Sequence, residues 1–172
     1  MDQLSRATLI SLDKADPVEI EHLLDLAFGP GRHGRTAYRI REGTDCLPPL
    51  CFAAYDDQSV LVGTIQAYPV ALTDSAGRAH PLIMVGPVAI HPERQGQGFG
   101  RALMAAQESA IDPAAPLPQV LIGDASYYAR FGFVEAPRGW KCPGPWDPER
   151  LMIRGANPAI LPQAGMLGPW PD

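Results

Sequence analysis

The sequence has few of the features that mark membrane, secreted or metal-binding proteins. None of its apolar runs approaches the roughly 18 residues of a membrane-spanning helix, and the first residues lack the basic start and apolar stretch of a signal peptide. The three cysteines, Cys46, Cys51 and Cys142, include no Cys-x-x-Cys pair, which favours a cytoplasmic location over a disulfide framework. The four histidines are scattered without ligand spacing, so we expect no metal.

Basic residues are too few for a surface that holds a polyanion. The 14 lysines and arginines are outnumbered by 19 aspartates and glutamates, which gives a formal net charge of −5. A chain with this balance has no overall positive field to attract nucleic acid. We therefore expect neither nucleic acid nor a membrane as a partner.

Proline and glycine are abundant and unevenly distributed. They make up 36 of the 172 residues, about 21%, against roughly 12% in ordinary chains. Residues 137–172 hold 13 of them together with all three tryptophans. Because disordered tails are normally poor in aromatic residues, we expect this segment to pack, either on the same domain or against a second subunit in a homodimer.

The pattern of apolar residues predicts an α/β chain with an antiparallel middle. Strands are expected at 8–12, 50–55, 60–73, 82–90, 119–122, 133–135 and 151–153, and helices at 17–28, 36–41, 99–110 and 127–131. The turns within 50–90 are too short for crossovers, so those strands form a meander. Gly86-Pro87 interrupts the third of them and predicts a bulge or a parting of strands.

Three alternating glycines, Gly96, Gly98 and Gly100, separate that strand from the next helix. Exposed N–H groups at a helix start bind phosphates, and glycine lets a ligand approach the backbone closely. The spacing is not that of a dinucleotide fingerprint, and no Lys-Ser/Thr follows as in a P-loop. A glycine-rich turn without any ligand is the alternative interpretation.

Two motifs resemble those of the GNAT acetyltransferases. Gln95-x-x-Gly98-x-Gly100, which follows a strand and opens a helix, resembles motif A of that family. The run Tyr128-x-Arg130-x-Gly132-Phe133 resembles its motif B. The segment from Ala27 to Glu42 is similar to a bacterial branch, the YhbS-like predicted N-acetyltransferases.

The resemblance implies the GNAT fold, a mixed and mostly antiparallel sheet with a splayed pair of parallel strands and flanking helices. It implies acetyl-CoA as co-substrate, with pantetheine between the splayed strands and the pyrophosphate on the glycine loop. The cofactor-binding residues implied are Val88, Ala89, Ile90, Arg94, Gln95, Gly96, Gln97, Gly98, Phe99, Gly100 and Arg101.

Tyr128 occupies the position of the family's general acid, which protonates the departing CoA thiolate. The alternative is a packed tyrosine whose hydroxyl faces solvent. The general base is left open among Asp124, His91 and Glu93, because an amine must lose a proton. The basic residues between 32 and 41 either steer an anion or form a solvated helix face.

The expected function is transfer of an acetyl group from acetyl-CoA to a primary amine, with a small molecule as acceptor. An acetyltransferase acting on a protein amine and a non-catalytic acyl-CoA-binding module are the alternatives. The expected domains are a GNAT acetyltransferase domain at 1–154 and a Pro/Gly-rich C-terminal extension at 155–172.

Overall fold

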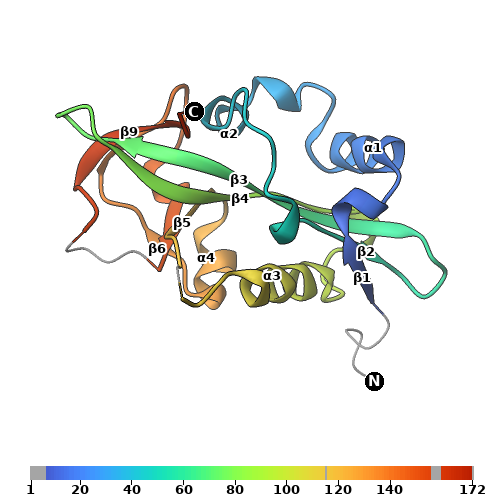
Figure 1. Ribbon diagram of the computed structural model, residues 1–172. Helices are drawn as coiled ribbons and strands as arrows, with labels where there is room; N and C mark the ends of the chain where they lie inside the picture. Colours follow the sequence, from blue (N-terminus) through green and yellow to red (C-terminus); the bar gives the residue numbers. More distant parts are fainter. Residues whose placement is uncertain (1–6, 115, 156–159, 172) are drawn as a thin grey trace. The chain divides into compact units, whose positions relative to one another are not determined.

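The computed structural model describes residues 7–114, 116–155 and 160–171, and mixes helices with strands (Figure 1). The elements follow one another as β1 (Thr8–Ser11), α1 (Pro17–Phe28), α2 (Thr36–Ile40), β2 (Phe52–Tyr55), β3 (Leu61–Thr73), β4 (Ala79–Ile90), α3 (Phe99–Ala110), β5 (Gln119–Ile122), α4 (Ala125–Tyr128), β6 (Val134–Glu135), β7 (Gly139–Lys141), β8 (Leu151–Arg154) and β9 (Ala164–Pro169).

The chain forms two compact units, which are described separately below. Unit 1 consists of Met1–His33, Cys46–Ala67 and Gly86–Pro113, and unit 2 consists of Gly34–Asp45, Tyr68–Val85 and Ala114–Asp172. The long strands β3 and β4 pass from one unit into the other, so each unit contains part of both.

Unit 1 packs helices on both faces of an antiparallel sheet. β2 pairs with β1 on one side and with β3 on the other, and α1 and α3 lie on opposite faces of these strands (Figure 1). The core on the α1 side consists of buried apolar residues from the helix, the strands and the connecting segments: Leu12, Ala15, Ile20, Leu23, Leu24, Cys51, Ala53, Leu61 and Ala89.

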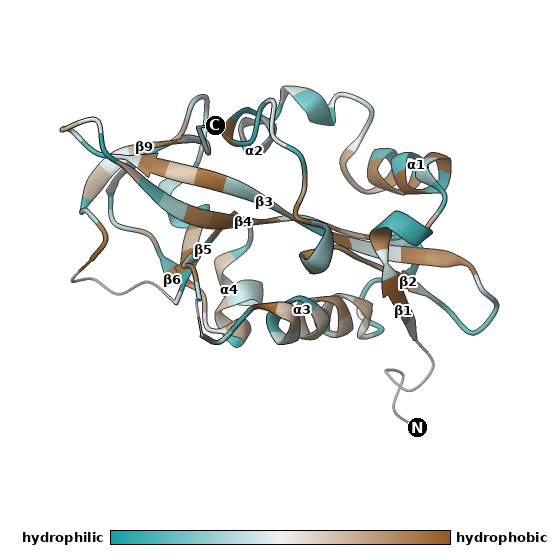
Figure 2. Ribbon diagram, viewed as in Figure 1, coloured by the Kyte–Doolittle hydropathy of each residue, from teal (hydrophilic) through white to brown (hydrophobic). Residues whose placement is uncertain are grey.

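Local sequence explains where α1 begins and ends. The Asp16 carboxylate accepts the N–H of Val18 at 2.9 Å, and Pro17 occupies the first helical turn, where a missing N–H costs nothing. Gly29 ends the helix with a φ of +89°, a left-handed conformation that suits glycine. Apolar and polar residues alternate along α1 (Figure 2), as expected of a helix with one buried face.

Helix α3 is held to the strands of unit 1 by a buried amide as well as by apolar contacts. The side chain of Gln107, 1% exposed, donates from Nε2 to the carbonyl of Leu50 at 2.9 Å and to that of Gln66 at 3.2 Å. Gly63 on β3 lies so close to the Leu103 side chain that an added Cβ would approach it to 3.0 Å. The middle and second half of α3 are thereby held against the strands of unit 1.

Unit 2 contains the parallel strand pair that the sequence predicts. β4 and β5 are paired in parallel at Ile83–Gln119 and Met84–Val120. Within the described part of unit 2, Leu121 and Ile122 still pair with β8 but have no partner on β4. β8 also pairs antiparallel with β6. The pairing of β4 with β5 thus stops just before Gly86-Pro87, the dipeptide where the sequence predicts strand parting.

The C-terminal region adds two strands that the apolar pattern does not reveal. β9 pairs antiparallel with the end of β3, placing Val70 opposite Pro169, and pairs in parallel with β7. Trp140 of β7 is 1% exposed, and its indole N–H donates to the carbonyl of Pro162 at 2.9 Å. Residues 156–159 of the expected extension lie outside the described residues, and the boundary at 154/155 stays a prediction.

The α/β class is confirmed, with a mostly antiparallel sheet, the β4–β5 parallel pair and flanking helices. The expected helix at 127–131 is instead the short α4 followed by a 3-10 turn at Ala129–Phe131, since Asp124 caps the helix earlier. Among the described residues, the helices are all too short or too polar to cross a membrane.

Two glycines of the C-terminal strands test this packing. A Cβ on Gly139 would come within 2.4 Å of the Gln163 backbone carbonyl, whereas a Cβ on Gly168 would meet nothing within 4 Å. We expect Gly139→Ala to lower the free energy of unfolding by about 1–3 kcal/mol, and Gly168→Ala to leave it unchanged or raise it slightly. Chemical denaturation measures both, and equal midpoints for the two variants would contradict the β7–β9 pairing.

Candidate functional site

The turn after β4 in unit 1 is closed by His91 before the chain reaches the glycine loop. The His91 N–H donates to the carbonyl of Val62 at 2.8 Å, and its carbonyl accepts the Arg94 N–H at 2.8 Å. Its ring Nδ1 accepts the N–H of Glu93 at 3.2 Å. Because that bond uses the ring lone pair as an acceptor, His91 serves as the cap of a 3-10 turn.

The loop then turns twice through left-handed glycines. Gly96 has a φ of +77° and Gly98 a φ of +90°, and Gly98 is the residue that precedes α3. Both conformations are strained for residues with a Cβ. Within the described residues, the N–H groups of Gly96, Gly98 and Gly100 have no hydrogen-bond acceptor, and no side chain caps the helix.

These unpaired N–H groups form a concentrated positive site. The first N–H groups of a helix lack partners within it and carry part of the positive end of its dipole. Gln95, Gly96 and Arg101 are exposed, Gln97 and Gly98 are half-buried, and Phe99 and Gly100 are buried. A phosphate can therefore reach the loop from solvent while α3 remains anchored by Phe99.

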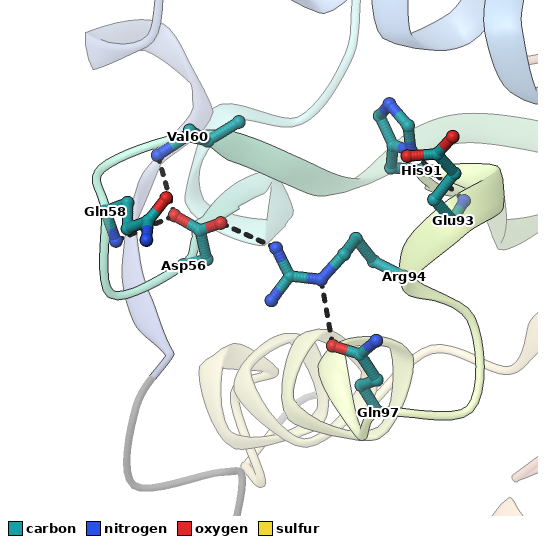
Figure 3. A network of polar contacts seen from close by, with 7 residues as sticks. All are labelled: Asp56, Gln58, Val60, His91, Glu93, Arg94 and Gln97. Carbon is teal, nitrogen blue, oxygen red and sulfur yellow. Dashed lines mark hydrogen bonds and ion pairs between the residues drawn. The ribbon is translucent and has the colours of Figure 1, made fainter.

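Arg94 is held by a network that local sequence does not reveal (Figure 3). Its Nη1 donates to Oδ2 of Asp56 at 2.6 Å, and its Nε donates to Oε1 of Gln97 at 2.8 Å. Its guanidinium also lies 5.2 Å from the centre of the Phe99 ring. Asp56 is thus a residue of this loop's surroundings that the motif does not include.

The end of β4 alternates between buried and accessible positions. Ala89 is fully buried in the core beneath α1, whereas Val88 and Ile90 are half-buried. The tip of the Ile90 side chain would lie 3.0 Å from a Cβ placed on Gly63. The three predicted cofactor-contacting residues therefore differ: Ala89 has no exposed surface, while Val88 and Ile90 are partly exposed.

Tyr128, in unit 2, lies at the end of the short helix α4. Its ring packs on Gly123, where a Cβ would come within 2.5 Å of the ring, and against the edge of Tyr127 at a centroid distance of 5.0 Å. The ring centre of Phe133 lies 6.1 Å away. Burial raises the pKa of Tyr128 to about 12, so its hydroxyl remains protonated at any ordinary pH.

Asp124 positions α4 from its first turn. One carboxylate oxygen accepts the N–H groups of Ser126 and Tyr127 and the hydroxyl of Ser126. The hydrogen bond from the Ser126 hydroxyl has the largest effect on the Asp124 carboxyl, and those from the two backbone N–H groups add to it. Together they hold the pKa of this carboxyl below its usual value. A carboxylate stabilised in this way is a poor proton acceptor, which argues against Asp124 as the general base.

The arginines of the expected basic cluster lie in different environments. Arg32 is 2% exposed and is paired with Glu21 and Asp25 inside unit 1. In unit 2, Arg41 lies over the ring of Tyr38 at 4.1 Å and that of Tyr68 at 3.8 Å. The cluster is therefore divided between structural roles.

Cysteine and metal chemistry find no support among the described residues. Cys51 and Cys142 are buried, and burial raises the pKa of each thiol to about 12, which leaves both unreactive. Within residues 7–114, 116–155 and 160–171, no group of three or more histidine, cysteine, aspartate or glutamate side chains is placed to hold a metal ion.

A protein-family model matches the segment that contains the glycine loop and the strands around it. The acetyltransferase (GNAT) domain matches residues 48–135, just over half of the chain. The chain belongs to the GNAT acetyltransferase family. The predicted family and fold are thereby confirmed, and the protein is an N-acetyltransferase. The match extends from the turn before β2 to β6, so it contains both predicted motifs.

Solved structures of GNAT proteins share the fold. The GNAT family N-acetyltransferase YhbS from Escherichia coli, solved in complex with CoA, has a TM-score of 0.71 at 23% identity, covering 96% of this chain and 90% of that one. A GNAT family acetyltransferase from Brucella melitensis, solved with acetyl-CoA, has a TM-score of 0.54 at 24% identity, covering 87% of this chain and 96% of that one.

A third structure, described as histone acetyltransferase HPA2 and related acetyltransferase from Corynebacterium glutamicum, has a TM-score of 0.57 at 19% identity, covering 90% of this chain and 99% of that one. No curated protein gives a significant match. At these identities the likeness extends to the fold, and the acceptor has to be inferred from this chain's own residues.

Replacement of Asp124 separates a capping role from a catalytic one. Asparagine caps helices as well as aspartate does, so we expect Asp124→Asn to retain acetyltransferase activity within about twofold, and Asp124→Ala to lose more because α4 and Tyr128 are released. Steady-state kinetics and a melting curve are needed for each. A hundredfold loss in Asp124→Asn with an unchanged melting temperature would instead assign the general base to this carboxylate.

Proposed function

We propose that this protein transfers the acetyl group of acetyl-CoA to a primary amine of a small molecule. The observation that carries the proposal is the row of unpaired N–H groups at Gly96, Gly98 and Gly100, in a member of the GNAT family. Structural neighbours from Escherichia coli and Brucella melitensis were solved with CoA and acetyl-CoA, which supports the same cofactor here.

The loop binds the pyrophosphate through its backbone. The N–H groups from Gly96 to Arg101 donate to the phosphate oxygens, and the exposed side chains of Gln95 and Arg101 add polar and charged contacts. The backbone of Val88, Ala89 and Ile90 pairs with the amides of pantetheine, because a strand that ends its pairing leaves such groups available.

The reaction requires little from the protein beyond orientation and charge stabilisation. A neutral amine attacks the thioester carbonyl, and a backbone N–H between Val88 and Ile90 stabilises the oxyanion that develops. The C–S bond breaks and the CoA thiolate leaves. The amine loses a proton to water or to a base, and the departed thiolate takes a proton from water.

The environment of Tyr128 defines how it assists the thiolate. With a pKa near 12, the phenol is a weaker acid than a free thiol, whose pKa is about 8.5. Complete proton transfer from Tyr128 to an unperturbed thiolate is therefore uphill. The tyrosine acts mainly as a neutral hydrogen-bond donor to the developing sulfur anion, and this role needs a hydroxyl that stays protonated.

Binding of the cofactor is tested by thermal shift. We expect CoA and acetyl-CoA to stabilise the protein, by about 2.7 kcal/mol at a concentration of 100 times the dissociation constant. Pantetheine, which lacks the pyrophosphate, is expected to give a much smaller shift at equal concentration. The absence of any shift with either CoA or acetyl-CoA would contradict the proposed cofactor.

The reaction is tested with a panel of small-molecule amines and lysine-containing peptides, by following the release of CoA thiol. We expect turnover with a small amine. Turnover with the peptides alone would show that the acceptor is a protein amine, contrary to the proposal.

With the best acceptor, Tyr128→Phe is expected to lower kcat by about a hundredfold while the KM for acetyl-CoA stays nearly unchanged. Tyr127→Phe, at the neighbouring ring, is the matched control and is expected to retain activity. Because burial keeps the Tyr128 phenol protonated, kcat is expected to show no falling limb from this group between pH 7 and 10. Equal kcat values for Tyr128→Phe and wild type would remove Tyr128 from the mechanism.

A further inference from the structure

The turn between β2 and β3 in unit 1 is organised by the carboxylate of Asp56. Its Oδ1 accepts the N–H groups of Gln58 and Val60, each at 2.9 Å. The backbone N–H of Asp56 donates to the Val60 carbonyl at 3.0 Å. Ser59 in this turn has a left-handed φ of +61°, which is uncommon for a residue with a side chain. Asp56 therefore holds the turn in a defined conformation.

The second carboxylate oxygen of Asp56 faces a different segment. It accepts a 2.6 Å hydrogen bond from Arg94, which lies 38 residues away in the sequence. The Asp56 side chain is 6% exposed and that of Arg94 is 30% exposed, so the ion pair is anchored at its buried end. The hydrogen bond from the Val60 N–H, and after it in size the one from Arg94, hold the pKa of the Asp56 carboxyl below its usual value. The carboxylate therefore stays ionised.

Arg94 connects the turn held by Asp56 to the glycine loop. Its Nε donates to the side-chain oxygen of Gln97, which lies between Gly96 and Gly98 (Figure 3). Its guanidinium also lies over the ring of Phe99 at the start of α3, 5.2 Å from the ring centre. A single guanidinium thus connects the β2–β3 turn with both the loop and the helix. These two hydrogen bonds give Arg94 a structural use, in addition to the direct phosphate contact that the family resemblance implies.

We propose that Asp56 is a positioning residue for CoA, which acts through Arg94 and Gln97 to hold the N–H groups of the glycine loop in their phosphate-binding arrangement before CoA arrives. This inference rests on the proposed function. Order that exists before binding does not have to be created on binding, so it raises affinity. Asp56 itself carries a negative charge and is no ligand for a phosphate.

If Asp56 has this role, its replacement affects only ligands that carry the pyrophosphate. Asp56→Asn keeps an oxygen that can accept from Gln58 and Val60 but replaces the acceptor of the Arg94 bond with an amide N–H₂. We expect its dissociation constant for CoA to rise about tenfold, with kcat at saturating acetyl-CoA nearly unchanged. The rate with acetyl-pantetheine, an acyl donor without the pyrophosphate, is expected to stay at the wild-type value. Asp57→Asn, at the exposed neighbouring position, is the matched control.

A double-mutant cycle separates positioning from direct contact. Arg94→Gln leaves the Asp56 turn intact and is expected to weaken CoA binding about as much as Asp56→Asn, and the double variant no further than either. If Arg94→Gln weakens CoA binding equally in the wild-type and Asp56→Asn backgrounds, Arg94 contacts the phosphates by itself and the proposal is overturned.

Two further outcomes overturn the inference: unchanged CoA affinity in Asp56→Asn, and an equal loss of rate with acetyl-CoA and acetyl-pantetheine, which indicates general damage to the fold. Should Asp56→Asn fail to fold, Arg94→Gln alone can still contradict the proposed link, by showing wild-type affinity for CoA. Calorimetry of wild-type protein with CoA tests the proposed function separately. If it shows no binding, the proposed function itself is contradicted.

Discussion

The function proposed for this chain depends on the unpaired N–H groups at the start of α3. The backbone turns through left-handed positions at Gly96 and Gly98, and within the described residues the N–H groups of the loop have no acceptor. Such groups are costly unless solvent or a ligand pairs with them. Burial of Phe99 and the hydrogen bonds of Gln107 anchor the helix, so the loop is arranged for an anion before one binds.

Phosphate binding and stabilisation of the thiolate, the two parts of the proposed chemistry, depend on different physical properties. The proposed phosphate binding uses backbone dipoles and a partly buried ion pair, which need fixed geometry but no titration. The role of Tyr128 uses a hydroxyl whose pKa burial has raised to about 12. A neutral phenol suits a thioester, since the thiolate leaving group needs stabilisation more than a full proton. Asp124, with its lowered pKa, serves this arrangement by holding α4.

The parts of the fold that local pattern encodes were predictable from the sequence. Regular apolar spacing marks α1 and α3, Asp16 and Pro17 mark the start of α1, and the motif around Gly98 marks the glycine loop. β9 was not predictable, because Gly165, Gly168 and Pro169 are typical of turns, and its strand depends on pairing with β3 and β7. The Asp56–Arg94 pair joins residues 38 positions apart, a separation that no local pattern reports.

The central claim is that the backbone of the glycine loop receives the pyrophosphate of CoA. Amide NMR of the protein titrated with CoA tests it most directly, because a hydrogen bond to a phosphate shifts an amide proton downfield. The account predicts large downfield shifts at Gly96, Gly98 and Gly100 that saturate with CoA and are absent with pantetheine. Saturable CoA binding that leaves these three amide resonances unmoved would contradict it.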